Sequence, residues 1–432
     1  MKFRGLAAGV SALLVVAGLA ACGGGDDSGS EGDVTLTYWA SNQGASLDND
    51  KEILTPELEK FTQQTGIKIN LEVVPWSDLT NRTLSAAVSG QGPDVLNIGN
   101  TNAVTFQATG GFYPFDDAAL AKIGGKDHFV DSAFATAGAP GKPPTSIPIY
   151  SQVYALYYNK KMFSDAGLQP PQTWEDLVSD AQKLTDPAKK KWGVVIPGAT
   201  VNASMHFSFI FGQQNGGDAF DASGKPTFTT PGMVAGVKQY VDLMSRYHVV
   251  NPSAAQYSDS AQAAGDFARG DAAMYFAQTS GINVLKQNGM DPEQYGIVPI
   301  PAPSGGNDIG SFVAGTNISI FKNTKHLDAA LQFVKFMTSD AEQATLNKAY
   351  TSLPAVKGVS ASFTDDQQKL DTFTDILANR AKPLPLVAGV QAFQANVGGA
   401  VVSLIAKAAT GAQVSEADVR NALDQAQQKM PA

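Results

Sequence analysis

The sequence predicts an α/β protein in which sheets carry helices on both faces. The main observation is that patterns typical of strands and of helices alternate along the chain after residue 33. A β-α-β-α-β order of this kind favours mostly parallel strands joined by crossover helices. The second observation is length, because 432 residues are enough for two domains, each with its own hydrophobic core.

The first 21 residues have the pattern of a secretory signal. Lys2 and Arg4 supply a positive start, and residues 6–21 are apolar or small. This stretch is short for a transmembrane helix, which needs about 20 apolar residues. Residues 22–33 are mainly Gly, Ser, Asp and Glu, which predicts a flexible, solvated tether between the signal and the folded protein.

Cys22 is the only cysteine and follows Leu19, Ala20 and Ala21 directly. This junction resembles the lipobox of bacterial lipoproteins. The resemblance implies that the sulfur of Cys22 receives a diacylglycerol and that cleavage makes Cys22 the new N-terminus. The protein would then be anchored at the extracellular face of the cell membrane, on the periplasmic side where an outer membrane exists. The alternative is a plain signal peptide with an incidental cysteine. Without further cysteines the mature chain forms no disulfides, so its stability must come from its core.

Strands and helices are expected in alternation over residues 34–99. Strands are predicted over residues 34–40, 67–74 and 93–99, and helices over residues 53–66 and 76–90. Ser77 is the expected N-cap of the second helix. Open sheets bind ligands beyond the carboxyl ends of their strands. The polar residues that follow the strands are therefore candidate ligand contacts: Ser41, Asn42, Gln43, Asn100, Thr101 and Asn102.

Residues 148–187 form the most distinctive stretch. They predict an aromatic-rich strand, a short helix, a Pro-Pro turn and a second helix. Thr173 and Asp176 have the spacing of a capping box at the start of that second helix. Trp174 at the same helix start is expected to be a packing residue.

This stretch closely resembles the signature of family 1 extracellular solute-binding proteins, the group that includes maltose-binding protein. The matching residues are Pro148, Tyr158, Asn159, Phe163, Gly167, Leu168, Pro171, Thr173 and Trp174. Further segments resemble the family in the expected order, namely residues 90–95, 267–281, 295–306 and 326–346. The joint order and spacing are specific, and the resemblance covers nearly all of the chain from residue 34.

The resemblance implies a two-lobed periplasmic-binding-protein-like fold of type II with a ligand cleft between the lobes. By analogy, lobe 1 contains residues 34–146 and 304–353. Lobe 2 contains residues 147–303 and, mainly, the C-terminal helices over residues 354–432. Such a protein closes on its ligand and delivers it to the permease subunits of an ABC transporter with their ATPase. It does no covalent chemistry, needs no cofactor or metal, and is expected to be a monomer.

Further ligand contacts follow from the resemblance. Gln152 lies seven residues before Asn159, where sugar-binding members often carry a carboxylate. Trp39 could face a sugar ring or the core. The remaining candidates are Asn202, Ser204, His206, Gln278, Thr279, Ser280, Asn317 and Phe393. The alternatives are solvated loop residues, and a hydrogen-bonded structural histidine for His206. Relatives often place a tryptophan after the strand that ends near Gln278, and this sequence has none there.

Composition and motifs exclude several functions. A net charge of −9, from 31 Lys+Arg and 40 Asp+Glu, argues against a nucleic-acid partner. The four histidines lack the spacing of metal ligands. An anchored hydrolase is disfavoured because there is no G-x-S-x-G, no H-E-x-x-H and no evident carboxylate pair. A surface receptor with the same fold stays open. The candidate positions are nearly free of charge, which favours a neutral mono- or disaccharide. A glycerophosphodiester or an amino-sugar is the alternative.

Overall fold

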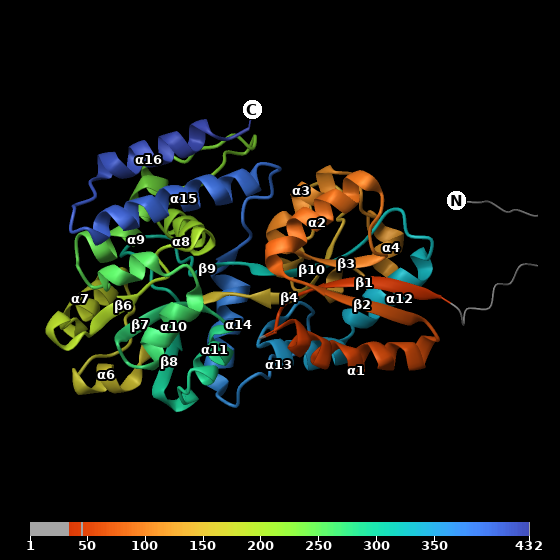
Figure 1. The fold of residues 1–432 in the computed structure, drawn as a ribbon, viewed down its shortest axis with the longest axis horizontal. Coiled ribbons are helices and arrows are strands. Elements are labelled where there is room, and N and C mark those ends of the chain that lie inside the picture. The colour runs from red at the N-terminus through yellow and green to blue at the C-terminus, as the bar shows by residue number, and fades with distance from the viewer. Residues whose placement is uncertain (1–33, 45, 432) are drawn as a thin grey trace, which may run out of the picture.

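The computed structural model describes residues 34–44 and 46–431, which contain a small two-stranded sheet and two main β-sheets flanked by helices. Figure 1 shows them in the two halves of the molecule, which we call lobe 1, with the six-stranded sheet, and lobe 2, with the four-stranded sheet. The predicted α/β class is confirmed. The predicted signal peptide (residues 1–21), the lipid site Cys22 and the tether (residues 22–33) lie outside the described residues.

The sheet of lobe 1 is mixed rather than mostly parallel. Its strands in spatial order are β11 (Leu353–Pro354), β4 (Ile147–Gln152), β10 (Ala314–Ile320), β3 (Val95–Gly99), β1 (Thr35–Ser41) and β2 (Lys68–Val74). β1 is parallel to β2 and β3, whereas β10 runs antiparallel between β3 and β4. A strand that enters from lobe 2 starts where β1 and β3 end, so it must run against them.

Helices cover both faces of this sheet. They are α1 (Leu47–Thr65), α2 (Trp76–Ser89), α3 (Ala103–Ala108), α4 (Asp117–Lys122), α5 (Asp131–Phe134), α12 (Leu327–Met337) and α13 (Asp340–Tyr350). α1 starts earlier than predicted because Ser46 caps it by accepting from the N–H of Asn49. The predicted N-cap Ser77 is wrong: Pro75 precedes the helix and Trp76 is its first residue.

Lobe 2 contains a smaller sheet that is packed against many helices. Its strands in spatial order are β6 (Trp192–Val195), β7 (Ala272–Gln278), β5 (Tyr154–Asn159) and β8 (Tyr295–Val298). Only the β6–β7 pair is parallel. Its helices are α6 (Lys160–Asp165), α7 (Trp174–Leu184), α8 (Val201–Gln214), α9 (Pro231–Ser245), α10 (Ser260–Ala268), α11 (Gly281–Gln287), α14 (Gln367–Asn379), α15 (Val390–Ala409) and α16 (Glu416–Gln428).

The core of lobe 2 is rich in aromatic rings. Phe207 and Phe211 of α8 pack against Tyr240 of α9, with ring centroids 5.0 and 5.9 Å apart. The predicted capping box of Thr173 and Asp176 is present at the start of α7. α15 is apolar and long enough to cross a membrane, but it packs on α8, α9 and α16 as a core helix. Its hydrophobicity is therefore used inside lobe 2.

The chain passes between the lobes at three places. β4 of lobe 1 and β5 of lobe 2 are separated by Val153 alone, so the predicted single aromatic strand is two strands in different sheets. The strand pairing of β4 puts residues 147–152 in lobe 1, whereas the sequence assigned them to lobe 2. Residues 299–313 and 355–366 make the other two passages and include β9 (Ser311–Phe312), which pairs with β12 (Ala381–Lys382).

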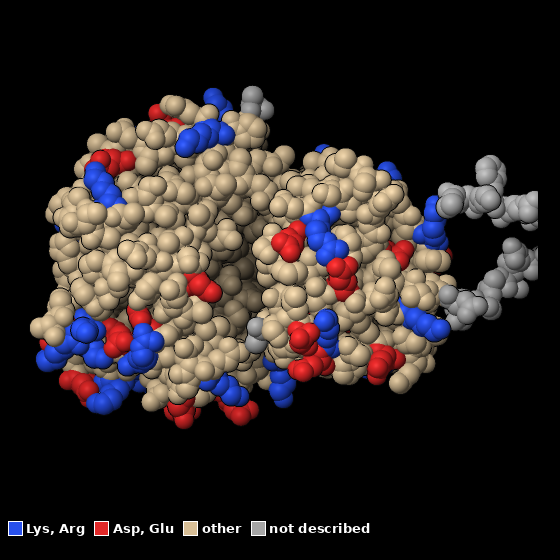
Figure 2. Space-filling view, viewed as in Figure 1, with Lys and Arg blue, Asp and Glu red and all other residues tan. Residues whose placement is uncertain are grey.

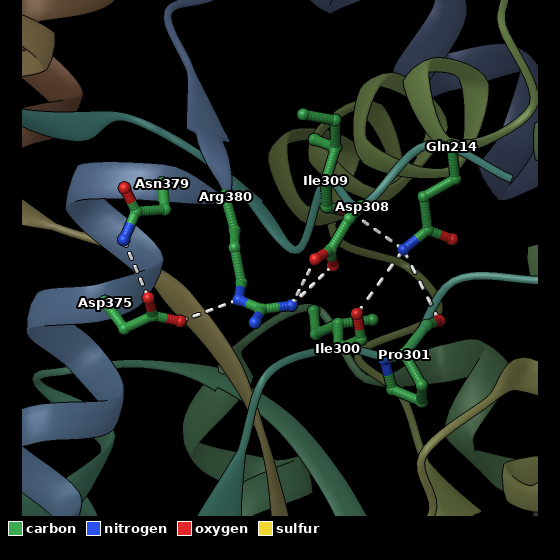
Figure 3. Close-up of polar contacts among 8 residues, drawn as sticks. All are labelled: Gln214, Ile300, Pro301, Asp308, Ile309, Asp375, Asn379 and Arg380. Carbon is green, nitrogen blue, oxygen red and sulfur yellow. Dashed lines mark hydrogen bonds and ion pairs between the residues drawn. The ribbon is translucent and has the colours of Figure 1, made fainter.

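The second passage is held firmly against lobe 2. Gln214 of α8 donates through Nε2 to the carbonyl of Ile309, at 2.8 Å, and points at the carbonyls of Ile300 and Pro301 (Figure 3). Arg380, after α14, pairs with Asp308 at 2.6 Å and with Asp375 at 2.7 Å. These contacts fix the segment that leads into β10 at the edge of the cleft.

Candidate functional site

A cavity of about 600 Å³ lies between the two lobes, and Figure 2 shows the hollow between the halves of the molecule. We call it the cleft. The carboxyl ends of β1, β3 and β4 open into it from lobe 1, and the end of β7 opens into it from lobe 2, which is where α/β sheets bind ligands. The cleft is lined by Asn42, Gln43, Gly44, Trp76, Gly99, Asn100, Thr101, Gln152, Asn202, His206, Asp259, Gln278, Ser280, Phe312, Ala314, Gly315, Thr316 and Gln394.

The loop of residues 42–44 is fixed by one buried carboxylate. Asp50, on the first turns of α1, accepts from the backbone N–H groups of Gln43 (3.1 Å) and Gly44 (2.9 Å) and from the side chain of Asn42. Gln43 in turn donates to the hydroxyl of Thr316 on β10, at 3.0 Å. The loop therefore lines the cleft on a rigid support.

Trp76 supplies an aromatic face on the wall of lobe 1. It opens α2, lies against Gly99 and is 42% exposed. A Cβ at residue 99 would lie 3.4 Å from the indole, an ordinary van der Waals contact, so the ring packs directly on the end of β3. A large exposed aromatic side chain in a cavity is a feature of ligand sites rather than of ordinary surface.

His206 of α8 is a neutral hydrogen-bonding group on the wall of lobe 2. Its Nδ1 lies 2.9 Å from the Tyr154 hydroxyl, and its ring packs against Phe312 with centroids 4.4 Å apart. Burial among these rings lowers the pKa of His206 to about 3. Nε2 is left for a ligand, as a donor if the Tyr154 hydroxyl donates to Nδ1 and as an acceptor if Nδ1 donates to that hydroxyl.

Several polar atoms around the cleft have no partner. Oδ1 of Asn100, Oε1 of Gln152 and Nε2 of Gln394 are buried and make no hydrogen bond within the part of the chain that the structure describes. An unsatisfied buried polar atom costs about 1–3 kcal/mol, so such atoms require an explanation. All three residues line the cleft, so these atoms are candidates to bond a polar ligand or water there.

The cleft carries little charge. Asp259, the N-cap of α10, is the one charged side chain among the described residues that line it, and no Lys or Arg of these residues does so. The candidate positions were expected to be nearly free of charge, and Asp259, which was not one of them, adds a single carboxylate to the wall. Over residues 34–44 and 46–431, no group of three or more His, Cys, Asp or Glu could hold a metal ion.

Nine predicted site residues lie on the cleft wall. They are Asn42, Gln43, Asn100, Thr101, Gln152, Asn202, His206, Gln278 and Ser280. Their contact with a ligand stays a prediction. The structure brings them together from four strand ends and from the first turns of α8, although they are far apart in sequence.

The other predicted residues from strands lie off this wall because their side chains point away from it. Ser41 is buried beneath the Gln43 side chain, from which it accepts a hydrogen bond. Asn317 is buried and donates to Ser146 at 2.9 Å. Thr279 is fully buried between two residues that do line the cleft. Trp39 lies under the guanidinium of Arg82, 4.3 Å from the ring centroid.

The remaining three are placed by helix geometry. Ser204 lies two residues from both Asn202 and His206 on α8 and is buried on another face. Asn102 is buried and donates to Thr80 at 3.2 Å. Phe393 is fully buried and packs against Phe220 and Phe228 in the core of lobe 2.

Several wall residues were not predicted from the sequence, among them Trp76, Asp259 and Gln394. Trp76 comes two residues after β2 and opens α2. The rule that ligands bind beyond the carboxyl ends of strands could therefore have identified it. Asp259 precedes Gln262 with capping-box spacing, which identifies a helix start and therefore a position that can face a cleft. No sequence pattern identified Gln394 as a cleft residue, because it lies within the long apolar helix α15.

The family of bacterial extracellular solute-binding proteins matches residues 44–344. The Diacetylchitobiose binding protein DasA of Streptomyces coelicolor is 25% identical over 369 residues, 82% of each chain. The Multiple sugar-binding protein of Streptococcus mutans is 27% identical over 375 residues, 83% of this chain and 84% of that one. An ABC transporter solute-binding protein of Agrobacterium radiobacter, solved with ribitol, has a TM-score of 0.74 at 26% identity and covers 92% of this chain and 98% of its own. The chain thus belongs to the bacterial extracellular solute-binding protein family, whose members bind solutes for transport and are not enzymes.

Proposed function

We propose that this protein captures a neutral carbohydrate of one or two sugar units and delivers it to an ABC importer. The observation that carries the proposal is the chemistry of the cleft. Its wall combines amides, hydroxyls and a neutral imidazole with one exposed indole, and it contains no cation among the described lining residues. The names of the relatives in Streptomyces coelicolor and Streptococcus mutans, and the ribitol complex, support a polyhydroxylated ligand.

Each kind of wall residue fits a sugar. Side-chain amides such as Gln152 and Gln278 both donate and accept, as a hydroxyl does. The indole of Trp76 offers an apolar face to the C–H groups of a sugar ring. The unpartnered oxygen of Gln152 and nitrogen of Gln394 supply an acceptor and a donor that the protein itself does not satisfy.

The charge of the cleft wall favours some of the candidate ligands over others. A phosphodiester would bring a negative charge to a wall whose one charged residue is Asp259. That arrangement repels an anion and offers it no countercharge. An amino-sugar is the second candidate, because the carboxylate of Asp259 could pair with its ammonium group. With a neutral sugar or with an amino-sugar, the proposed function is binding alone and involves no covalent step.

Capture would work by closure of the lobes. Asn42, Gln43 and Trp76 belong to lobe 1, whereas Asn202, His206 and Gln278 belong to lobe 2. A ligand that touches both walls favours the closed form by its greater affinity for that form. We expect the closed monomer to present a composite surface to the permease. Small-angle scattering should therefore give a smaller radius of gyration with ligand than without it.

The same proposal includes attachment of the protein to the outer face of the cell membrane through Cys22. The order of signal, cysteine and Gly-Ser-Asp-Glu tether in the sequence supports it. Metabolic labelling with a radioactive fatty acid should mark the native chain and not a Cys22→Ala variant. Equal labelling of the two would refute the anchor and leave the binding function untouched.

The decisive test is a thermal-shift screen of the chain from Asp33 onward. The panel holds neutral sugars, sugar alcohols, amino-sugars and glycerophosphodiesters at millimolar concentration. A ligand at 100 times its dissociation constant stabilises by about 2.7 kcal/mol, which raises the melting temperature by several degrees. We expect hits among neutral sugars, and we expect Gln152→Ala to weaken them without unfolding the protein. Hits confined to glycerophosphodiesters would contradict the proposed ligand class.

A further inference from the structure

Lobe 1 contains a groove at the amino end of β1, away from the cleft. The groove has a volume of about 370 Å³ and lies between the end of α1 and the start of α12. We call it the exit groove, because the N-terminal segment joins the described chain at Val34, which lines it. Figure 1 shows that β1 starts on the side of lobe 1 that faces away from lobe 2. The lining residues are Val34, Thr65, Ile67, Lys325, His326, Leu327, Asp328, Ala329 and Gln332, and none of them lines the cleft.

The segment that precedes Val34 is short and strongly acidic. Residues 23–33 contain the carboxylates of Asp26, Asp27, Glu31 and Asp33 and no Lys, Arg or His. Because an extended chain advances at most about 3.6 Å per residue, Glu31 must stay within about 11 Å of Val34. Asp26 can lie as far as about 29 Å from Val34 by the same measure. The last two carboxylates are therefore always close to the exit groove.

The exit groove presents cations that the described chain leaves unpaired. Lys325 and His326 are exposed in its lining, and neither forms an ion pair with another described residue. Lys68, at the start of β2, is also exposed and has no such partner. Asp328 is the one carboxylate among the described lining residues, and it already pairs with Lys122 at 2.9 Å. The groove is thus locally positive, although the whole chain has a net charge of −9.

The start of α12 adds hydrogen-bond donors to this wall. His326 holds the N-cap position, and its side chain makes no cap hydrogen bond. The N–H groups of Leu327, Asp328 and Ala329 belong to the first helical turn, where no acceptor is available within the helix. A carboxylate at this position is favoured both by these N–H groups and by the helix dipole. The lining of the groove therefore combines two kinds of group that bind a carboxylate.

We propose that the acidic segment before Val34 docks in the exit groove of its own chain. Lys325, His326 and the first-turn N–H groups of α12 would bind the carboxylates of Glu31 and Asp33. Because both partners belong to one chain, the short connection holds them at an effective millimolar concentration, so weak contacts are enough for docking. The inference goes beyond the proposed function and does not depend on which solute the cleft binds.

Docking would hold the membrane anchor and the cleft at opposite ends of lobe 1. The cleft lies at the carboxyl ends of β1 and β3, whereas the exit groove lies at the amino end of β1. With Cys22 acylated as proposed above, only residues 22–30 would span the distance between the membrane and lobe 1. An extended chain of that length reaches about 30 Å. The docked segment would therefore shorten the free tether and keep it away from the cleft.

Amide hydrogen exchange tests the docking directly. The sample is the chain of residues 22–432, kept reduced, and the comparison is a Glu31→Gln/Asp33→Asn variant. The matched control is Asp26→Asn/Asp27→Asn, which removes the same charge farther from the groove. At about 20 mM salt, we expect residues 327–329 to exchange about threefold more slowly in the native chain and in the control than in the Glu31→Gln/Asp33→Asn variant. At about 1 M salt, where the Debye length is about 3 Å, the difference should disappear.

A second pair of variants tests the groove side of the contact. Lys325→Gln should remove most of the difference in exchange between the charged and the neutral tether. Lys322→Gln is the matched control, because Lys322 is exposed on the same segment and does not line the groove; it should preserve the difference. Melting curves verify that every variant is folded, and all the substitutions are at exposed positions or in the tether.

The inference is overturned if the native chain and the Glu31→Gln/Asp33→Asn variant exchange residues 327–329 at equal rates in low salt. It is also overturned if the Asp26→Asn/Asp27→Asn control loses the protection equally, because the effect would then be one of general charge. An anionic lipid surface is the other occupant that a positive groove would suit. If vesicles of phosphatidylglycerol protect these amides while neutralising the tether changes nothing, the groove binds lipid and the proposal fails. Each of these failures leaves the solute-binding function untouched.

Discussion

Trp76→Ala should weaken carbohydrate binding about tenfold. Trp76 is 42% exposed on the cleft wall, and a tryptophan presents about 250 Å² of surface, so about 100 Å² of indole is free to cover. Covering about half of it stabilises a complex by about 1.3 kcal/mol at 25 cal/mol per Å², which corresponds to about a tenfold change in dissociation constant. Trp76→Phe should keep most of the affinity because it keeps an aromatic face.

The assay is titration calorimetry with the best ligand of the thermal-shift screen. Val88→Ala is the matched control, since Val88 is 89% exposed on the same helix and does not line the cleft. Tryptophan fluorescence gives an independent readout, because ligand stacking on Trp76 should change the emission of the native protein and not of Trp76→Phe. An unchanged dissociation constant for Trp76→Ala would refute the assignment of this indole as a sugar platform.

Three further changes test other parts of the structure. Asp50→Asn should weaken ligand binding at least tenfold, because an amide cannot accept from all the donors of the 42–44 loop. Titration calorimetry measures the affinity, and an unaltered value would show that the loop does not need this carboxylate. The pKa of His206 is about 3, so affinity should vary less than twofold between pH 5 and 8. The unfolded chain binds a proton at His206 near pH 6.5 and the folded chain only near pH 3. His206 therefore destabilises the fold progressively as pH falls through this window, by a few kcal/mol at most; a steep loss of affinity between pH 8 and 5 would contradict the neutral imidazole. Gly193→Ala should lower the melting temperature strongly, since a Cβ there would come within 2.3 Å of the α7 backbone. Gly399→Ala on α15 meets open space and should stabilise the fold by up to about 1 kcal/mol. Equal melting temperatures for these two variants would argue against the close packing of β6 on α7.

The parts of the site that follow directly from strand ends could be predicted from the sequence. Asn42, Gln43, Asn100 and Thr101 come after β1 and β3, and parallel neighbouring strands end at the same sheet edge. The strand-end rule did not show which of the consecutive residues after a strand face the cleft. β7 ends at Gln278, which lines the cleft; of the two turn residues that follow, Thr279 is buried and Ser280, the N-cap of α11, lines the cleft.

The features that could not be predicted depend on long-range geometry. The sequence shows a strand over residues 148–159 but not that Val153 divides it between two sheets. Phe393 was placed by resemblance, and only the packing of α15 against Phe220 and Phe228 shows that it belongs to the core. Asp259 follows a long connection, so its approach to β7 is set by tertiary packing alone.

The position of β10 in the sheet has a consequence for the biosynthesis of the protein. β10 fills the gap between β3 and β4, and Asn100 at the end of β3 bonds to the carbonyl of Val313, 213 residues later. A nascent chain cannot place β10 in the sheet of lobe 1 until almost three quarters of the chain has been made. Contacts so distant in sequence form slowly, and a domain with a missing central strand exposes unpaired backbone on both sides of the gap. Lobe 1 of such a chain stays incomplete late into synthesis, and an incompletely folded polypeptide is the form that can be threaded across a membrane.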